Sequence, residues 1–305
     1  MSSKNSSIST KERLKTKYLS LTGIGNIAWK IARFVILFGL CFVIVYPFGV
    51  KIIDSFKSFQ DFLDPTVQYI PKYFTMDNIK NVMDQMGYKG ALIKTFLFSA
   101  LIAIIQVAIT SIIGYGFARF KFFGKTILFG LVILELIVPP QTIMIPLFIR
   151  FRFFYGGISL IGTLWPIILL TLTGLGIKSG LYIYMFRQFF INMPKELEEA
   201  AYIDGCNTFQ TYYKVMLPSA VSTMVTVFLL SFSWQWTDTT YSSLFRTTGL
   251  MANVINNVGD PDMEEVMLTT YNNTAAVLSV LPIAVVYLFG QRFFIQGVER
   301  SGITG

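Results

Sequence analysis

The chain lacks the side chains that most enzymes use for acid–base chemistry. Its 305 residues include no histidine, which excludes His-based metal sites, Ser–His triads and the usual proton shuttle near neutral pH. Cys41 lies in an apolar run and Cys206 in a charged segment, so we expect no disulfide framework. Gly124 and Lys125 imitate the end of a phosphate-binding loop, but Arg119 occupies the leading glycine position and no strand is expected before it. We therefore expect no catalytic residue, no metal site and no ATP site in this chain.

Charged residues concentrate in one segment, PKELEEAAYIDGCNTFQTYYKVMLP, from Pro194 to Pro218. Proline suits the first turn of a helix, and the three glutamates that follow favour its positive N-terminal end. Gly205 suits a left-handed helix stop, and Asn207 or Thr208 can cap a second helix. We expect a stiff helix–turn–helix that can transmit force. The alternative is an ordinary surface hairpin between two apolar segments.

The composition is that of a membrane protein. Hydrophobic residues make up 53% of the chain and charged residues only 14%, with a mean hydropathy of +0.58, which is too apolar for one soluble domain. The net charge of +8 is compatible with nucleic-acid binding, but the basic residues lie mostly between apolar runs, whereas a nucleic-acid footprint should cluster on one folded face. We expect helices in a lipid bilayer and no nucleic-acid partner.

Six apolar segments are long enough to cross a bilayer, since about 20 helical residues span about 30 Å. They are approximately residues 31–52, 93–117, 127–149, 159–186, 219–238 and 273–296. The fourth is overlong and contains Pro166 and several glycines, so part of it is expected to tilt or unwind. The predicted fold is therefore an all-α polytopic membrane protein with six transmembrane helices.

The distribution of basic residues predicts the orientation of these segments. Lys and Arg are more numerous in the segments that face the cytoplasm when the N-terminus is cytoplasmic, as the positive-inside rule requires. Both termini and the insert at 187–218 are then cytoplasmic. Residues 1–30 form a basic N-terminal segment, and residues 31–305 form one transmembrane domain. The first apolar run is too long for a signal-peptide core, so we interpret it as a retained anchor.

Two charged residues lie inside the predicted spans. Glu135 is in the third span and Lys178 in the fourth, and an isolated charge at the bilayer centre costs about 3 kcal/mol or more. Both are expected about 12 Å from the cytoplasmic edge, so they either form an ion pair or face a path between the helices. The alternative is that Lys178 extends toward the lipid headgroups.

Polar and aromatic residues also gather at the end of the fifth span. The group consists of Trp234, Gln235, Trp236 and Asp238. Aromatic faces, amides and carboxylates suit the C–H groups and hydroxyls of sugars, so these residues are candidates for contact with a glycan. An interfacial belt of tryptophans is the simpler interpretation.

The charged segment resembles the EAA loop of binding-protein-dependent ABC importer permeases. The resemblance covers residues 31–305 and is closest to the maltose-type permeases of carbohydrate uptake systems. It is carried also by the sequences MFRQFFINMPKELEEAAYIDG, IIGYGFARFKFFGK, LIVPPQTIMIPLF and QRFFIQGVERSGITG. Three positions depart from the family pattern: Val215 replaces an isoleucine, Thr237 an asparagine and Thr304 a lysine.

The resemblance implies a type I ABC importer permease fold, in the plasma membrane of a prokaryote. It implies an ATPase-coupling role for Glu199, Ala200, Ala201, Gly205, Leu217 and Pro218. The partners are then a second homologous permease, two ATPase subunits and an extracytoplasmic sugar-binding protein. ATP and Mg would be bound by the ATPase subunits, so this chain would be a transport subunit and not an enzyme. A sugar or oligosaccharide would cross the membrane by alternating access.

Three other functions compete with this interpretation. The same architecture could carry a non-sugar solute. An ion-coupled secondary transporter is less favoured, because histidine is absent and carboxylates are sparse within the apolar segments. A membrane enzyme is third, because no plausible pair of nucleophile and base is present.

Overall fold

The computed structural model of the chain describes residues 21–260 and 262–302, and the side chains of 25–260 and 262–291. Most of these residues are helical, with no strand in the described ranges. The chain divides into two compact units, one that ends at Thr75 and one that begins at Met76. Residue 30, the predicted end of the basic segment, lies inside the first described helix, and the predicted division into a basic segment and a membrane domain stays a prediction.

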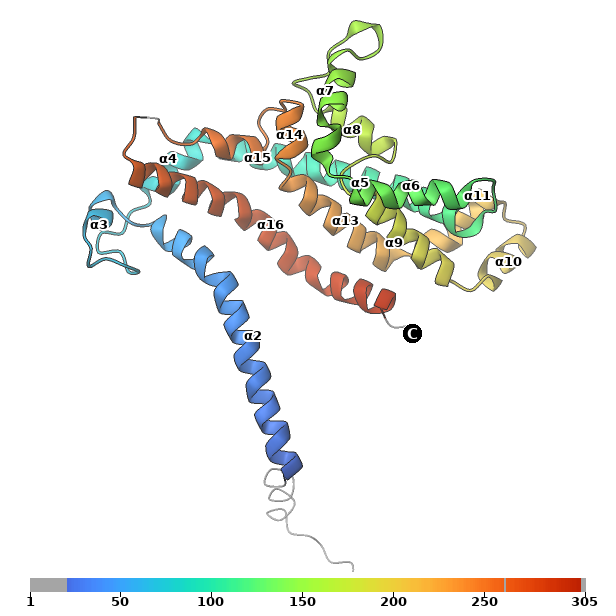
Figure 1. The fold of residues 1–305 in the computed structure, drawn as a ribbon, viewed down its shortest axis with the longest axis horizontal. Coiled ribbons are helices and arrows are strands. Elements are labelled where there is room, and N and C mark those ends of the chain that lie inside the picture. The colour runs from blue at the N-terminus through green and yellow to red at the C-terminus, as the bar shows by residue number, and fades with distance from the viewer. Residues whose placement is uncertain (1–20, 261, 303–305) are drawn as a thin grey trace, which may run out of the picture. The chain divides into compact units, whose positions relative to one another are not determined.

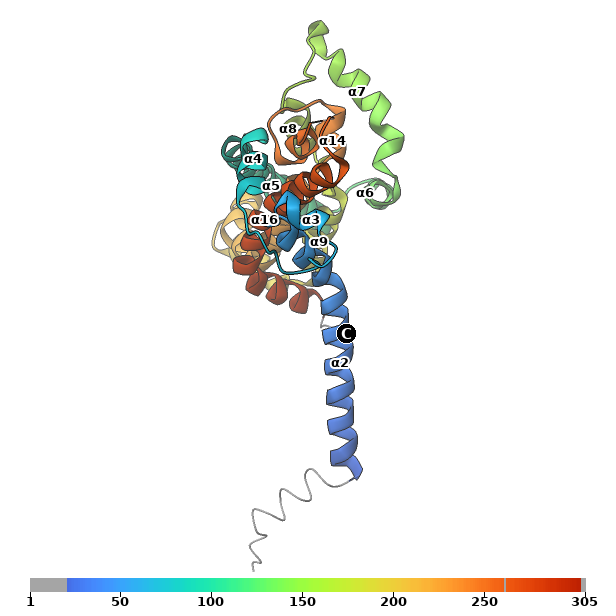
Figure 2. The same ribbon diagram turned by 90° about the vertical axis from the view of Figure 1, so that its left-hand side faces the viewer.

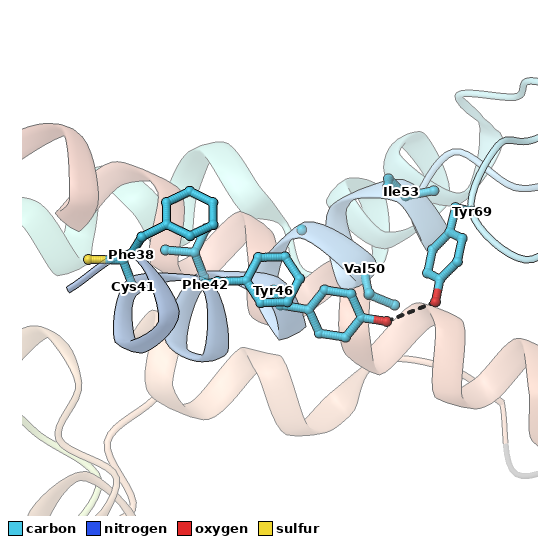
Figure 3. Close-up of a pocket in the computed structure, with 9 residues that line it drawn as sticks. Phe38, Cys41, Phe42, Tyr46, Val50, Ile53 and Tyr69 are labelled. Atoms are coloured by element: carbon cyan, nitrogen blue, oxygen red, sulfur yellow. Dashed lines mark hydrogen bonds between the residues drawn. The ribbon is translucent and has the colours of Figure 1, made fainter. Parts of the chain in front are cut away.

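The described part of the first unit, residues 21–75, contains one long helix and a short surface helix. Helix α2 (Leu21–Asp54) is long and apolar enough to cross a membrane, and α3 (Phe59–Leu63) follows it, capped by Ser58. The hydroxyls of Tyr46 and Tyr69 lie 3.1 Å apart beside an apolar pocket of about 380 Å³ on one face of α2 (Figure 3). The loop after α3 is thus anchored on the end of α2.

The second unit is organised around α5 (Tyr88–Arg119). This helix packs along α9 (Ser179–Asn192) and α13 (Val221–Trp236), and α13 packs in turn on α16 (Glu265–Gly302) (Figure 1). The side chains of Phe186 and Phe232 are almost fully buried between these helices. Shorter helical segments in this unit are α4 (Asp77–Gln85), η2 (Tyr155–Gly157), α14 (Thr240–Leu244), α15 (Met251–Val254) and η4 (Ile255–Asn257).

Two of the predicted spans are broken helices. In the third, α6 (Lys125–Ile137) and the segments η1 (Pro140–Ile143) and α7 (Met144–Arg152) meet at 105° (Figures 1 and 2). The prolines at 139 and 140 lack backbone N–H donors, so the helix cannot continue through them. In the fourth, α8 (Trp165–Leu172) and α9 are separated by a turn in which Gly174 and Lys178 have φ of 77° and 61°.

The polar insert forms a chain of short helical segments between α9 and α13. They are α10 (Glu196–Ile203), α11 (Thr208–Thr211), the π-helical turn η3 (Tyr212–Met216) and α12 (Leu217–Ser219). The stretch from α11 to α12 meets α13 at 77°. The insert therefore changes direction sharply where it joins the bundle.

The all-α prediction is confirmed for the described residues, whereas the count of six spans is not. Three helices, α2, α5 and α16, are long and apolar enough to cross a membrane, and up to five crossings result if each of two bent pairs is one span. The expected fourth span is divided between α8 and α9, neither of which reaches 18 residues. Gly174 and Lys178 adopt left-handed backbone conformations in the turn that divides it.

Close packing of α5 on α9 depends on Gly114. A Cβ atom there would lie 2.6 Å from the Cβ of Phe186 and 3.0 Å from the backbone nitrogen of Arg187. Gly116, one half-turn further along α5, has open space on the equivalent side, with the nearest atom of Phe120 at 4.0 Å.

We predict that Gly114→Ala destabilises the protein by about 1–3 kcal/mol, because the added methyl overpacks the α5–α9 contact. Gly116→Ala is the matched control and should be neutral or slightly stabilising, since alanine favours a helix. Thermal unfolding of the two variants in detergent compares them. Equal melting temperatures would contradict the packing argument.

Candidate functional site

The insert folds as the predicted helix–turn–helix. Helix α10 ends in a Schellman arrangement, in which the N–H of Gly205 donates to the carbonyl of Tyr202 at 3.1 Å and that of Cys206 to Ala201 at 2.9 Å. Gly205 has φ of 82°, the left-handed conformation expected for this stop. The next helix, α11, begins with a reciprocal capping box between Asn207 and Gln210. The angle between the two helices is therefore set by backbone hydrogen bonds.

The residues singled out on α10 divide between its surface and its packed side. Glu199 and Ala200 are exposed, and Ala201 is buried. Leu217 is half-buried and Pro218 exposed, and both lie in α12 at the far end of the insert. The structure thus places the six motif residues on one continuous segment but not in one cluster.

Exposed apolar side chains accompany the motif. Ile203 is 85% exposed and Phe209 68% exposed, and Leu197 and Tyr202 are also open. Apolar groups gathered on a charged surface segment indicate contact with a protein. This group, which we call the apolar ridge of the insert, consists of Leu197, Tyr202, Ile203 and Phe209.

Sequence reasoning missed the contacts of Glu198. This side chain is turned toward the bundle: its Oε1 accepts a hydrogen bond from the Tyr115 hydroxyl at 2.9 Å and lies 3.4 Å from Nε of Arg119. Arg119 also donates from Nη2 to the carbonyl of Met193 at 2.8 Å. Glu198 is adjacent to the motif glutamate, but its partners lie about 80 positions earlier in the chain, so no local pattern could have revealed them.

The expected ion pair between Glu135 and Lys178 is not formed. Instead, Oε2 of Glu135 accepts a hydrogen bond from the backbone N–H of Gly180 at 2.6 Å, in the first turn of α9. A carboxylate is favoured there by the unpaired N–H groups and the dipole of the helix end. The equal depth inferred for the two charges does not by itself bring them within ion-pair distance, because the ammonium group of Lys178 is directed to an aromatic ring.

Lys178 lies over an aromatic ring. Its Nζ is 5.1 Å from the centroid of Trp234, which is 46% exposed. This cation–π contact joins the predicted fourth and fifth spans. Of the residues grouped at the end of the fifth predicted span, Trp234 is therefore the one that contacts Lys178, a charge predicted to lie inside the membrane.

Glu135 and Lys178 line one pocket at the two helix breaks. It has a volume of about 520 Å³ and is bounded by residues of α6, η1, α7 and α8, together with Tyr241. Irregular backbone at membrane depth is tolerated where it is covered by protein or lines a cavity, and broken helices often mark transport sites. The pocket carries one acidic and one basic side chain on otherwise apolar walls.

The other span-five candidates have structural partners or are buried. Trp236 is buried and donates from Nε1 to the carbonyl of Ser279 at 3.0 Å. Both carboxylate oxygens of Asp238 accept hydrogen bonds from α14, from the N–H of Tyr241 and of Ser242 at 3.0 Å.

Gln235 is also buried, and its amide has no hydrogen-bond partner among the described residues. Of the four residues proposed for glycan contact, Trp234 is therefore the one with a side chain open at the surface.

Comparison with known proteins places this geometry in a family. Residues 106–300 match the family described as "Binding-protein-dependent transport system inner membrane component". The chain is 26% identical over 273 residues to the probable ABC transporter permease protein YurM of Bacillus subtilis, covering 89% of this chain and 87% of that protein.

Two further relatives are named for their cargo. The arabinooligosaccharides transport system permease protein AraQ of Halalkalibacterium halodurans is 26% identical over 87% of this chain and 93% of its own length. The probable starch degradation products transport system permease protein AmyC of Thermoanaerobacterium thermosulfurigenes is 25% identical over 85% and 91%.

A solved structure shares the fold. It is a chain of a bacterial ABC transporter involved in the import of the acidic polysaccharide alginate, with a TM-score of 0.71 over 88% of this chain and 98% of that chain. The sequence identity is 18%, so the likeness concerns the fold.

We predict that Gly180→Ala destabilises the protein by about 1–3 kcal/mol, because its Cβ would clash with Oε2 of Glu135 and lie 2.7 Å from the carbonyl of Val132. The penalty should be smaller in a Glu135→Ala background, where one of the two clashing groups is gone. Gly130→Ala, with open space around it on α6, is the control. Additive effects of the two substitutions in thermal unfolding would contradict the contact.

Proposed function

The chain belongs to the family of binding-protein-dependent transport system inner membrane components, and from that premise we propose that it is a membrane-spanning permease subunit of an ATP-driven carbohydrate importer. Its cargo would be a sugar or oligosaccharide. The names of the relatives AraQ and AmyC support this class of cargo. The chain acts as a transport subunit and catalyses no covalent step itself.

The observation that carries the proposal is the exposed, stiff helix α10. The motif residues Glu199 and Ala200 lie open on its surface beside the apolar ridge. The Schellman stop at Gly205 fixes its direction relative to α11. A rigid helix with an apolar surface outside the bundle is suited to dock into a partner protein and to be pushed by it.

The partner in this proposal is an ATPase subunit. The sequence has no phosphate-binding loop, so nucleotide and Mg must be bound by another chain. Two ATPase subunits, a second homologous permease and an extracytoplasmic sugar-binding protein complete the importer. The α10 helices of the two permeases would each contact one ATPase.

The proposed topology has six crossings and two cytoplasmic termini in the plasma membrane of a prokaryote. The crossings are α2, α5, α6 with α7, α8 with α9, α13 and α16. Counting α8 and α9 as one crossing rests on their shared break, where Gln106 of α5 donates to the Ile177 carbonyl at 3.0 Å and Glu135 accepts from Gly180. With these two break groups satisfied inside the protein, the pair can remain in the membrane.

Transport then proceeds by alternating access. ATP binding draws the ATPase subunits together and displaces the α10 helices with them. The bundle opens toward the binding protein and receives the sugar, and hydrolysis of ATP returns it to the inward-facing state. The pocket at the helix breaks supplies a carboxylate for hydroxyl donors and an ammonium group for hydroxyl acceptors along the path.

A non-sugar cargo is the second candidate, because family membership alone leaves the solute open. An ion-coupled transporter would make no use of an exposed α10. Purification of the chain with its bound partners, followed by assay of ATPase stimulation by binding protein loaded with a panel of glycans, separates these functions. We expect stimulation by at least one glycan, whereas uptake that survives ATP depletion but collapses with the ion gradient would refute ATP-driven import.

We predict that Gly205→Val lowers transport at least about tenfold while the bundle stays folded. The left-handed conformation costs a residue with a β-carbon about 1–2 kcal/mol, so the stop should open and α10 should lose its direction. A Cβ at this position meets no atom within 4 Å, which rules out a clash as the cause.

Gly205→Asn is the matched control, because asparagine tolerates this conformation at a helix stop. It should keep most of the transport in a reconstituted uptake assay. Equal activity of the two variants would show that the stop has no part in coupling.

A further inference from the structure

Glu198 differs from the other glutamates of α10 in its surroundings. Glu196 and Glu199 are exposed, whereas the side chain of Glu198 is only 13% exposed and that of Arg119 only 8%. Long charged side chains are seldom buried unless they are paired. The buried pairing of Glu198 therefore indicates a structural role for this side chain, beyond keeping the surface of α10 soluble.

The contact joins three helix ends. Arg119 is the last residue of α5, Met193 caps the C-terminal end of α9, and Glu198 is in the first turn of α10. Each charge is at the favourable end of its own helix, since cations suit C-termini and anions suit N-termini. The hydrogen bond from Arg119 to the Met193 carbonyl also satisfies a backbone group that the end of α9 leaves free.

Aromatic packing also attaches the insert to α5. The ring of Tyr115 lies 5.4 Å from Phe190 of α9 and 5.1 Å from Tyr212 of η3, between ring centroids. The Tyr212 hydroxyl is 2.8 Å from Oγ of Ser111, one turn earlier on α5. Both ends of the insert are thus fastened to the same two turns of α5, at the end of unit 2 where α10 and α11 lie (Figure 1).

The remaining connections of α10 are weaker as mechanical links. On one side, Met193 has extended backbone between α9 and α10. On the other, the stop at Gly205 fixes α10 on α11, but the π-helical η3 that follows α11 interrupts regular helix geometry. A push on α10 through the chain alone would be absorbed at these points.

We propose that Glu198, Arg119 and Tyr115 form a lock that fastens α10 to α5, so that the two helices move as one body. Displacement of α10 then enters the membrane bundle through α5. Because α5 packs against α8, α9 and α13, it can distribute the movement to the broken fourth span and to α13. This inference rests on the proposed function, in which an ATPase moves α10, and it assigns Glu198 a positioning role distinct from that of the exposed Glu199.

The test measures whether α10 and α5 keep their separation through the ATP cycle. In a Cys41→Ser background, spin labels are placed on Cys206, next to the end of α10, and on α5 by Ile112→Cys, at a position that is 50% exposed. Distances are measured by pulsed electron spin resonance in the complete complex with its partner permease and ATPase subunits, with and without ATP. Glu198→Gln removes the charge, and Glu196→Gln is the control with the same change at an exposed position of α10.

If the lock exists, the distance between the two spin labels has one narrow distribution that does not change with ATP. This holds for the otherwise unaltered protein and for Glu196→Gln. Glu198→Gln should broaden it and should lower sugar transported per ATP hydrolysed by about tenfold. Tyr115→Phe keeps the ring packing but removes one hydrogen bond, so it should give a smaller effect in the same direction and covers the case in which Glu198→Gln fails to fold.

The proposal is overturned if the distance changes with ATP before any lock residue is altered, or if Glu198→Gln matches Glu196→Gln in both distance and transport. Loss of the ATPase subunits from purified Glu198→Gln complex would also overturn it, because that result assigns Glu198 to docking. Failure of the proposed function gives a different result: the unaltered complex then shows no ATP-dependent uptake of any glycan.

Discussion

Helix breaks inside an apolar bundle impose the constraint on which this structure depends. Backbone groups freed at a break have no water to bind at membrane depth and must be satisfied by the protein. Here side chains from α5 and α6 supply the missing partners. At the break before α9, Gln106 donates to the backbone carbonyl of Ile177, and Glu135 accepts from the backbone N–H of Gly180. At the other end of α9, Arg119 donates to the backbone carbonyl of Met193.

This arrangement makes α5 the structural axis of the second unit. The helix is continuous over 32 residues, while the third and fourth predicted spans are divided. Its polar side chains support both ends of α9, and its close approach to α9 requires Gly114. Glu135, which the sequence suggested for the translocation path, therefore also holds the bundle together. The pocket that it lines lies between the two helix breaks.

The local features of the insert could be predicted from sequence because their causes are local. The glutamates in the first turn of α10, the stop at Gly205 and the cap at Asn207 depend on backbone conformation and hydrogen bonds within a few residues. Pro194, expected in that first turn, lies instead before the helix, whose N-cap is Lys195. The all-α class followed from apolar segments of bilayer length. The EAA spacing indicated the family to which the chain belongs.

Features that depend on contacts between distant residues could not be predicted. An estimate of depth placed Glu135 and Lys178 at one level, but their directions depend on where α9 begins. The division of the fourth span depends on a left-handed turn at a lysine, a residue with no general preference for that conformation. The sequence made Asp238 a candidate for contact with a sugar, and its carboxylate oxygens accept hydrogen bonds from backbone N–H groups of α14.

The central claim is that the surface around the end of α10 docks onto an ATPase subunit. Cys206 is half-buried, next to the helix stop, and in the Cys41→Ser protein it is the sole thiol of the chain. A short bifunctional thiol crosslinker applied to the assembled complex tests the claim most directly, with mass spectrometry to identify the product. The account predicts a crosslink from Cys206 to an ATPase subunit, and a crosslink to the extracytoplasmic binding protein would contradict it.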